Sequence, residues 1–325
     1  MRKIVAVPIG CGHYLPKRQV NNSEFERTID TTNEWIISRT GIESRHFADP
    51  SENTSDLALK AARMALSDAK IAASELDALI LATATPDQTF PSTATRVQHS
   101  LGMNKGFAFD IQAVCAGFIF ALSNANALIK SGQVKKVMVI GAEIFSRILD
   151  WSDRSTCILF GDGAGALILE AAENNTKEIR RGILSTDLNS DGKYNDLLFV
   201  NGGVATTQTS GFVEMQGREV FKHAVSKLVS TAENSLKAAN LSTKDVNWVV
   251  PHQANSRIIS RTANIMGIDM NKVVMTVSNH GNTSAASIPI ALSCSKQQNR
   301  FKSGDLLLMK AIGGGLAWGS VAMRW

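Results

Sequence analysis

The residue whose type and setting point most clearly to covalent chemistry is Cys115, in the segment DIQAVCAGF at 110–118. An apolar pattern typical of a buried helix follows it as far as Ile129. The first turn of a helix offers unpaired N–H groups and the positive end of the helix dipole, and both favour an anion. We therefore expect the pKa of this thiol to be lowered, so that a thiolate nucleophile is available near neutral pH. Taken alone, Cys115 also fits a small buried side chain without a catalytic role.

Two later polar segments contain further candidates for the same site. His252 follows the apolar run Trp248–Val250 and Pro251, where a strand is expected to end. In open α/β folds, ligands bind at the carboxyl ends of strands. The second segment, SNHGNTSAA at 278–286, is a polar turn that precedes a helix of small residues. Either histidine taken singly could be a structural hydrogen-bonding residue, and we expect His280 to be one.

The segments that carry these residues belong to a pattern of elements that occurs twice in the chain. Residues 57–82 and 225–251 each read as an amphipathic helix, a short polar turn and a buried apolar strand. The tripeptide Lys-Ser-Gly then precedes an apolar strand at 130–132 and again at 302–304. A glycine-rich turn leads into the last strand of each copy. The chain is therefore expected to contain two similar α/β units.

We predict that these units are residues 1–174 and 175–325, joined by the polar stretch Glu173–Arg180. Because strands alternate with helices, we expect largely parallel sheets covered by helices and packed as one layered body. The turn GDGAG at 161–165 has the glycine spacing of part of a dinucleotide-binding fingerprint. A strand pattern follows it where that fingerprint requires a helix, so we predict a tight turn and no nucleotide site.

The composition limits the classes of partner. Of the 325 residues, 44% are hydrophobic and 19% are charged, and the formal net charge is +5. The 34 lysines and arginines are scattered along the chain, so nucleic-acid binding is not expected, although a basic patch for an acidic protein or a phosphate-bearing ligand remains open. No run approaches the roughly 20 apolar residues of a membrane helix. The apolar stretch Ile4–Ile9 is interpreted as a buried first strand rather than part of a signal peptide.

The cysteines indicate a reducing environment. Cys11, Cys115, Cys157 and Cys294 form no CxxC pair and have no metal-ligand spacing with histidine. We expect free thiols, a cytoplasmic protein and no metal site.

Several motifs, in order along essentially the whole chain, resemble those of the thiolase-fold condensing enzymes, and among these the 3-oxoacyl-(acyl-carrier-protein) synthase III family. The motifs lie at residues 30–35, 39–42, 90–92, 110–118, 160–166, 251–257, 281–289 and 313–320. The resemblance implies an α/β thiolase-like fold with a duplicated five-layered α-β-α-β-α architecture. It also implies an enzyme that initiates type II fatty acid synthesis.

The resemblance implies a catalytic triad of Cys115, His252 and Asn282. Acetyl-CoA would acylate Cys115, and a polarizable thiolate suits attack on a thioester. Decarboxylation of a malonyl-acyl-carrier protein would then give an enolate, whose oxygen two neutral donors, His252 Nε2–H and the Asn282 amide, could stabilise. The products would be acetoacetyl-acyl-carrier protein, CO₂ and CoA. Backbone N–H groups of Cys115 and Gly314 would form the oxyanion hole, where glycine permits close backbone approach.

The resemblance also implies where the two substrates bind, with coenzyme A as a substrate and no cofactor. Trp35 and Arg154 would sandwich the adenine, which suits an indole and a guanidinium. The residues implied for coenzyme A are Thr31, Trp35, Arg39, Arg154, Gly217, Ala254 and Asn255. Those implied for the acidic carrier protein are Lys222, Gln253, Ala254, Asn255, Ser256 and Arg257. Asn264 and Ile265 stand where some relatives carry lysines that strengthen the carrier-protein patch, so a less basic patch is expected here.

A homodimer is implied as well, because Phe90 matches a position that closes the acyl pocket of the partner subunit. A bulky aromatic there favours a short primer. Two alternatives remain. The chain could be a related synthase that uses other acyl-CoA primers, in branched-chain or secondary metabolism, or a non-catalytic thiolase-fold binding module. Retention of all three triad residues argues against the binding module.

Overall fold

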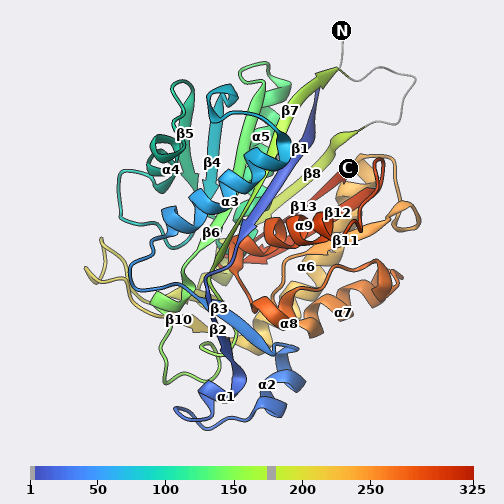
Figure 1. The fold of residues 1–325 in the computed structure, drawn as a ribbon. Coiled ribbons are helices and arrows are strands. Elements are labelled where there is room, and N and C mark those ends of the chain that lie inside the picture. The colour runs from blue at the N-terminus through green and yellow to red at the C-terminus, as the bar shows by residue number, and fades with distance from the viewer. Residues whose placement is uncertain (1–3, 174–180) are drawn as a thin grey trace.

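Two β-sheets form the centre of the molecule in the computed structural model, which describes residues 4–173 and 181–325 (Figure 1). The predicted joining stretch Glu173–Arg180 lies, from residue 174 on, outside the described residues. The first sheet has the strand order β1 (Ile4–Tyr14), β7 (Gly163–Glu173), β6 (Lys136–Glu143), β4 (Ala78–Ala82), β5 (Phe107–Ile111). The second has the order β8 (Gly182–Ser190), β13 (Ala317–Arg324), β12 (Leu306–Gly313), β11 (Trp248–Pro251).

The two sheets follow the same plan, but they are mixed rather than largely parallel. In the first sheet β4 pairs in parallel with β5 and β6, whereas β7 runs antiparallel to both β1 and β6. In the second sheet β11 and β12 are parallel, whereas β13 runs antiparallel to β12 and β8. The prediction of largely parallel sheets is therefore wrong. It missed that β12 and β13 are joined by a short turn, which only an antiparallel pair allows.

Helices complete five layers around the two sheets, in agreement with the expected α-β-α-β-α architecture (Figure 1). The central layer is α5 (Gly117–Lys130) and α9 (Ser287–Gln297), whose apolar residues pack in one cluster with strands of both sheets. On the outer face of the first sheet, α3 (Thr54–Ala69) and α4 (Thr93–Leu101) form a second cluster. On the outer face of the second, α6 (Gly217–Ala238) and α7 (Ser256–Ile265) contribute to a third.

Shorter elements gather at the lower end of the view in Figure 1. They are α1 (Asn22–Phe25), α2 (Asn33–Thr40), α8 (Val277–His280), the hairpin β2 (Arg18–Asn21) and β3 (Ser44–Phe47), and the pair β9 (Leu198–Val200) and β10 (Val213–Met215). Buried Arg45 holds this end together, because its guanidinium donates to the carbonyls of Val20 and Ile158 and to Asn22 Oδ1. Seven 3₁₀ turns connect the elements that the structure describes: η1 (Ala73–Glu75), η2 (Val114–Ala116), η3 (Phe145–Ile148), η4 (Gly192–Leu197), η5 (Thr243–Asp245), η6 (Met270–Lys272) and η7 (Ser284–Ala286).

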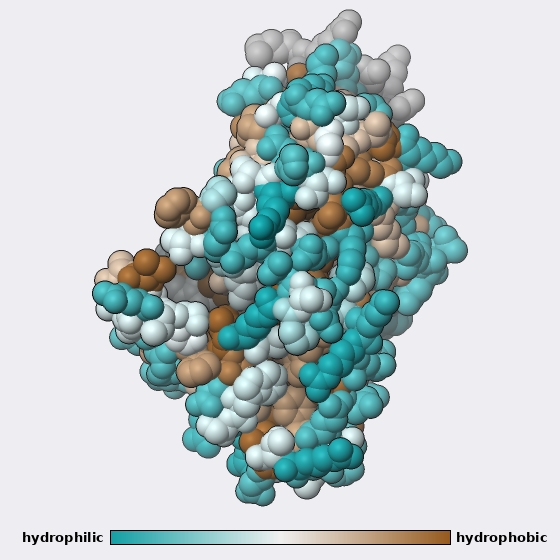
Figure 2. All heavy atoms as spheres, turned by 60° about the vertical axis from the view of Figure 1, so that its left-hand side comes forward, coloured by the Kyte–Doolittle hydropathy of each residue, from teal (hydrophilic) through white to brown (hydrophobic). Residues whose placement is uncertain are grey.

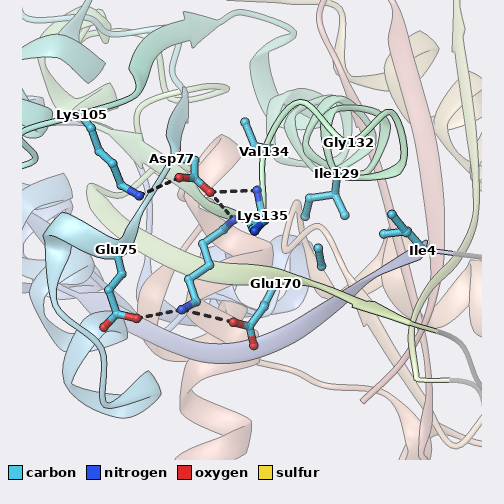
Figure 3. Close-up of a pocket in the computed structure, with 11 residues that line it drawn as sticks. Ile4, Glu75, Asp77, Lys105, Ile129, Gly132, Val134, Lys135 and Glu170 are labelled. Atoms are coloured by element: carbon cyan, nitrogen blue, oxygen red, sulfur yellow. Dashed lines mark hydrogen bonds and ion pairs between the residues drawn. The ribbon is translucent and has the colours of Figure 1, made fainter.

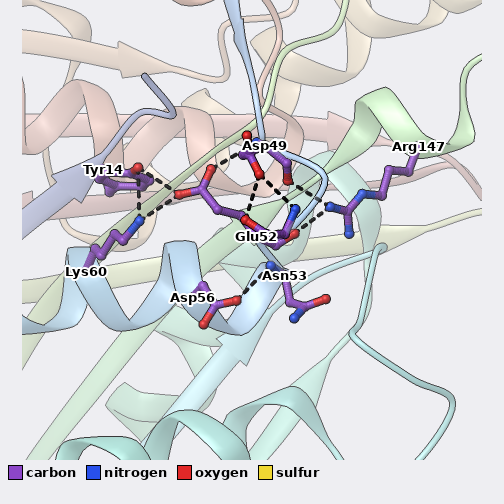
Figure 4. Close-up of polar contacts among 8 residues, drawn as sticks. Tyr14, Asp49, Glu52, Asn53, Asp56, Lys60 and Arg147 are labelled. Carbon is purple, nitrogen blue, oxygen red and sulfur yellow. Dashed lines mark hydrogen bonds and ion pairs between the residues drawn. The ribbon is translucent and has the colours of Figure 1, made fainter. Parts of the chain in front are cut away.

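A network of polar contacts fixes the loop that leads from β3 into α3 (Figure 4). Glu52 Oε1 accepts hydrogen bonds from the Tyr14 hydroxyl at 2.8 Å and from Lys60 Nζ at 2.6 Å. Arg147 donates to the backbone carbonyls of Asp49 and Glu52 from the opposite side. These contacts tie β1, α3 and η3 together at the edge of the lower region.

One face of the molecule is largely polar. Figure 2 shows this face, on which hydrophilic side chains predominate and apolar ones are scattered among them. Within residues 4–173 and 181–325, no helix has the length and apolar character needed to cross a bilayer.

Candidate active site

Cys115 lies in η2, immediately before α5, as the sequence predicted. Its surroundings consist of small residues that let three chain segments meet. A Cβ at Gly117 would lie 3.1 Å from Ala82 Cβ, and a Cβ at Gly313 would lie 2.7 Å from the Cys115 backbone nitrogen. Larger side chains at these positions would separate α5 from β4 and β12. The close approach leaves the cysteine only 3% exposed.

This burial overturns the expectation that the thiol has a lowered pKa. Burial raises the pKa of Cys115 to about 12, the Ser284 hydroxyl lowers it in part, and the nearby Glu143 carboxylate raises it. The helix start is present, but burial disfavours the charged thiolate more than the Ser284 hydroxyl and the Cys115 backbone N–H favour it. The sulfur is therefore held as a thiol, and its proton must be removed before it can act as a strong nucleophile.

His252 extends from the end of β11 as a neutral imidazole. Its backbone N–H donates to Lys310 O at 2.8 Å, which continues the parallel ladder with β12. Burial lowers the pKa of its ring to about 3. Its Nδ1 lies 2.7 Å from Ser287 Oγ, which also lies 2.9 Å from the Ser284 carbonyl. Ser287 has a single hydroxyl hydrogen, which it donates to the Ser284 carbonyl in this structure. When that hydrogen turns to Nδ1 instead, the ring hydrogen resides on Nε2 and can be donated to a substrate oxygen.

Asn282 is fixed by backbone contacts on both sides. Its N–H donates to Leu159 O at 2.9 Å, and its Oδ1 accepts from the Ser284 N–H at 2.9 Å. Because Oδ1 is occupied in this way, the side-chain NH₂ is the group left to donate. Gly281 precedes it with a φ of +64°, a conformation that L side chains rarely adopt.

One short turn, Ser284–Ser287, brings the three predicted triad residues together. The Ser284 hydroxyl lowers the pKa of the Cys115 thiol, and the Ser284 N–H donates to Asn282 Oδ1. Ser287, three residues on, contacts His252. The arrangement offers a sulfur nucleophile and two neutral donors from three different segments of the chain.

Gly314 lies beside this cluster in the turn between β12 and β13. A Cβ there would lie 2.5 Å from Leu198 O and 3.6 Å from a methyl group of Val114. With Gly313 packed on the Cys115 nitrogen, the backbone of this turn runs next to η2. This is the close approach that an oxyanion hole built from the Cys115 and Gly314 N–H groups requires.

His280 lies apart from these contacts. Its ring faces His46, with centroids 6.3 Å apart, and burial lowers its pKa to about 4. Its structural role remains a prediction.

Sequence reasoning missed Glu143, the last residue of β6. Its carboxyl group is fully buried and accepts hydrogen bonds from Thr83, Ala84, Thr85 and Ser284. Burial raises its pKa to about 7, against the effect of these donors. The available signal was an acidic residue that ends an otherwise apolar strand, KVMVIGAE. Such a residue at the carboxyl end of a buried strand is a candidate site residue.

The residues expected to bind adenine lie in direct contact with each other. The Arg154 guanidinium is 4.6 Å from the Trp35 ring centroid, and that of Arg39 is 5.9 Å from it. Arg154 also donates to the backbone carbonyl of Asp30. An adenine can therefore enter between Trp35 and Arg154 only if the two side chains separate. Thr31 lies just before α2 and is half-buried, and its hydroxyl is a buried atom without a hydrogen-bond partner.

Of the remaining predicted coenzyme A residues, Ala254 and Asn255 lie next to Ser256, which contacts the end of α2. A Cβ at Gly41, just after α2, would lie 2.4 Å from Ser256 Oγ at the start of α7. Asn255 caps α7, since its Oδ1 accepts from the Ile258 N–H at 2.9 Å, and Ala254 precedes it half-buried. Gly217 begins α6 and is exposed.

The residues expected to contact a carrier protein are exposed or half-buried, except for Gln253. Lys222 and Arg257 are exposed on α6 and α7, and the Arg257 guanidinium lies 5.7 Å from the ring of Phe221, next to Lys222. Gln253 is only 1% exposed. Its NH₂ donates to Pro251 O and Val274 O, and its Oε1 accepts from two N–H groups. The prediction that Gln253 contacts a carrier protein directly is wrong, because its polar atoms support the loop after β11.

Phe90 does not belong to the site of its own chain. It is 82% exposed, whereas the site around Cys115 is buried. This exposure leaves it free to contact another molecule.

A separate hollow lies at the opposite end of the first sheet (Figure 3). Lys136, at the start of β6, contacts Glu75 and Glu170, and Lys105 contacts Asp77. Glu143 ends the same strand, so the hollow and Cys115 are separated by the length of β6. In the part of the chain that the structure describes, no group of His, Cys, Asp and Glu is placed to hold a metal ion.

Comparison with known proteins agrees with this geometry. Two family models match, described as 3-oxoacyl-(acyl-carrier-protein) synthase III at residues 109–192 and its C terminal at residues 236–325. A β-ketoacyl-(acyl-carrier-protein) synthase III from Ruegeria pomeroyi is 64% identical over 320 residues, which cover 98% of this chain and 99% of the relative. One from Rhodobacter capsulatus is 62% identical over 322 residues, 99% of each chain.

Solved structures lead to the same group. The crystal structure of a 3-oxoacyl-(acyl-carrier-protein) synthase III from Aquifex aeolicus has a TM-score of 0.92 at 44% identity, covering 98% of this chain and 100% of that chain. A priming β-ketosynthase from a polyketide pathway has a TM-score of 0.93 at 33% identity, covering 99% and 97%. The chain belongs to the 3-oxoacyl-(acyl-carrier-protein) synthase III family of thiolase-fold condensing enzymes.

Proposed function

We propose that this acyltransferase, an initiating condensing enzyme of fatty acid synthesis, acts through Cys115, His252 and Asn282. The observation that carries the assignment is the Ser284–Ser287 turn, which contacts Asn282 and His252 and whose Ser284 hydroxyl lowers the pKa of the Cys115 thiol. In the first half-reaction, the Cys115 sulfur attacks the thioester carbonyl of acetyl-CoA. The bond from the acetyl carbon to the coenzyme A sulfur breaks, and an acetyl-Cys115 thioester forms.

In the second half-reaction, a malonyl-acyl-carrier protein loses CO₂ and becomes an enolate. Neutral donors from His252 and Asn282 stabilise the enolate oxygen without protonating the carbon that must react. That carbon attacks the acetyl group, and the Cys115 sulfur leaves as acetoacetyl-acyl-carrier protein forms. The backbone N–H groups of Cys115 and Gly314 stabilise the tetrahedral oxyanions.

The two substrates share an entrance between α2 and α7. Trp35, Arg39 and Arg154 supply an aromatic face and cations for the coenzyme A nucleotide, with Thr31, Gly217, Ala254 and Asn255 along its path. Exposed Lys222 and Arg257 offer a basic surface to the acidic carrier protein, with half-buried Ser256 next to Arg257. Coenzyme A thioesters serve as substrates, and the proposed chemistry needs no cofactor or metal.

The protein is proposed to work as a cytoplasmic homodimer of duplicated halves, 1–174 and 175–325. β5 is the edge strand of the first sheet, and its Phe107 is exposed and stacks on Phe109. Pairing of β5 with its copy would cover this edge, which otherwise presents unpaired backbone groups. Exposed Phe90 would then be available to close the acyl pocket of the partner subunit.

A panel of acyl-CoAs with detection by intact mass tests the assignment. Acetyl-CoA should add one acetyl group, located at Cys115 by peptide mapping, and Cys115→Ser should abolish it. Cys294→Ser is the matched control and should be acetylated like the wild type. Acetylation of another cysteine would refute the nucleophile, preference for a branched acyl group would favour the related synthases, and no acylation by any member would favour a binding module.

A further inference from the structure

One buried side chain joins the two segments that carry the proposed enolate donors. Gln253 directly follows His252 at the end of β11 and is only 1% exposed. Its NH₂ group donates to Pro251 O at 2.9 Å, in its own segment, and to Val274 O at 3.0 Å, in the segment that leads to α8. Because the amide is buried, bulk water does not compete for these bonds, and the two segments are held together from inside the protein.

The oxygen of the same amide caps α8. Gln253 Oε1 accepts hydrogen bonds from the Thr276 N–H at 2.8 Å and from the Val277 N–H at 3.0 Å. These are the N-cap residue and the first residue of α8, and the side chain of Thr276 makes no capping bond itself. An oxygen from the end of a separate strand therefore takes the place of an N-cap side chain. With two bonds donated and two accepted, the amide has no hydrogen-bonding capacity left for a ligand.

The helix that Gln253 caps leads directly to Asn282. α8 is a single turn of four residues. At its end, the Gly281 N–H donates to Val277 O at 3.0 Å, and the next N–H, that of Asn282, donates to Leu159 O at 2.9 Å. A shift at the first residue of so short a helix is passed on to Asn282, because no longer element lies between them to absorb it.

The backbone of Gln253 also reaches the contact that orients the His252 ring. The Gln253 N–H donates to Ser287 Oγ at 3.3 Å, and the same oxygen lies 2.7 Å from His252 Nδ1. An N–H can only donate, so it occupies an acceptor site of the hydroxyl and restricts how that hydroxyl faces the imidazole. Gln253 is therefore bonded to a neighbour of each proposed donor.

We infer that Gln253 is a positioning residue that sets the His252 imidazole and the Asn282 amide relative to each other, so that both donate to the enolate oxygen in the second half-reaction. This inference rests on the roles proposed above for His252 and Asn282. Donors of this kind act at about 2.7–3.1 Å from the developing charge, and a misplacement of about 1 Å can cost 10²-fold in rate. Acetylation of Cys115 does not use these two donors, so it should not depend on Gln253.

The test compares the two half-reactions in Gln253→Met, which keeps a side chain of similar length but loses all four side-chain hydrogen bonds. For CO₂ release from a malonyl-carrier protein, kcat should fall about 10²-fold with little change in KM. The rate of Cys115 acetylation by acetyl-CoA, followed by intact mass, should stay within a few-fold of the wild-type rate. If Gln253 only stabilised the fold, both half-reactions would lose the same factor, and that result would overturn the inference.

A second measurement asks whether Gln253 acts through the two donors. In a His252→Ala background, one of the donors that Gln253 positions is already absent, so adding Gln253→Met should cost clearly less than it does in the wild type. If the two losses multiply in full, or if CO₂ release disappears altogether, Gln253 acts independently of His252 and the inference is wrong.

Gln253→Asn keeps the amide on a shorter side chain and serves if Gln253→Met does not fold. It cannot reach both segments at once, so it should show the same unequal loss to a smaller degree, and wild-type rates in both half-reactions would overturn the inference. Asn247→Ala is the matched control, because Asn247 Oδ1 accepts from the Leu306 N–H at 2.8 Å at the opposite end of β11.

The control should keep the wild-type ratio of the two half-reactions. An equally selective loss of CO₂ release in Asn247→Ala would show that any loosening of β11 has this effect, and would refute a specific role for Gln253. Normal CO₂ release by both His252→Ala and Asn282→Ala would instead refute the roles assigned under the proposed function, whatever Gln253→Met does.

Discussion

Substitutions at His252 and Ser287 should affect the two half-reactions unequally, because they remove successive parts of one hydrogen-bond chain. His252→Ala removes a donor to the enolate oxygen, and loss of such a donor costs about 10²–10³ in rate. Ser287→Ala leaves the imidazole in place and removes the 2.7 Å contact to its Nδ1. Loss of one neutral hydrogen bond is worth about 0.5–1.5 kcal/mol, or a factor of about 2–12.

Both effects should fall on decarboxylation of the malonyl-carrier protein, measured as CO₂ release. Acetylation of Cys115, measured by intact mass, should remain detectable in both variants, and Asn282→Ala should behave like His252→Ala. A His252→Ala variant with normal decarboxylation and no acetylation would refute this division of labour. Ser287→Ala that loses decarboxylation as completely as His252→Ala would refute the indirect role of Ser287.

The neutral state of His252 also has a pH signature. Its pKa falls from the usual 6.5 to about 3 in the folded protein. Between these values the unfolded chain binds more protons at this residue than the folded one, so stability falls as the pH decreases through that window. The slope from this one group is at most about 1.4 kcal/mol per pH unit. Between pH 7 and 4.5, the free energy of unfolding measured in urea should fall less for His252→Gln than for the wild type. An unchanged dependence of that free energy on pH would contradict a buried, neutral His252.

Three further outcomes are expected. The double variant Lys222→Glu, Arg257→Glu should weaken turnover of the malonyl-carrier protein more than acetylation by acetyl-CoA. Added salt should also weaken the carrier step of the wild type. Equal losses in both half-reactions would place these two residues in a channel that both substrates share. Trp35→Ala should raise the KM for acetyl-CoA with little effect on the carrier step, and an unchanged KM would exclude adenine stacking. Lys310 is buried with its Nζ 3.3 Å from Met266 Sδ, and burial lowers its pKa to about 7. Below pH 10 the unfolded chain therefore binds more protons at this residue than the folded protein, which destabilises the fold. Lys310→Met should raise the free energy of unfolding at pH 7 by several kcal/mol, at about 1.4 kcal/mol per pKa unit, and no gain would contradict this.

The succession of elements could be predicted from the sequence, because its signals are local. The amphipathic stretch that begins near residue 57 is α3, and the apolar run at 78–82 is β4. The corresponding elements of the second copy are α6 and β11. Strand direction could not be predicted in the same way. The antiparallel pairing of β13 with β12 depends on a turn at Gly314–Leu316 that brings the chain straight back, and this turn resembles any other glycine-rich loop in sequence.

The site was predictable in its residue types but not in its electrostatics. Cys115 could be placed at a helix start from a dozen neighbouring residues, but its pKa depends on burial by segments far along the chain, including Gly313. Gln253 reads as a polar loop residue, and only the contacts with Val274 and Thr276 show why it is buried. Glu143 and Ser284 lie 141 positions apart. No spacing in a single sequence connects such a pair.

The turns η2 and η7 begin with residues of nearly the same backbone conformation, Val114 with a φ of +47° and Ser284 with a φ of +48°. Each precedes one of the two central helices, but Cys115 in the first turn is matched in place by Ala285 in the second. A serine from the later turn lowers the pKa of this cysteine, and that serine donates to a glutamate from the earlier sheet. Chimeras that exchange one sheet and its central helix between relatives would therefore separate residues of the earlier unit from their neighbours in the later unit. Residues that meet across the two units must change together in evolution.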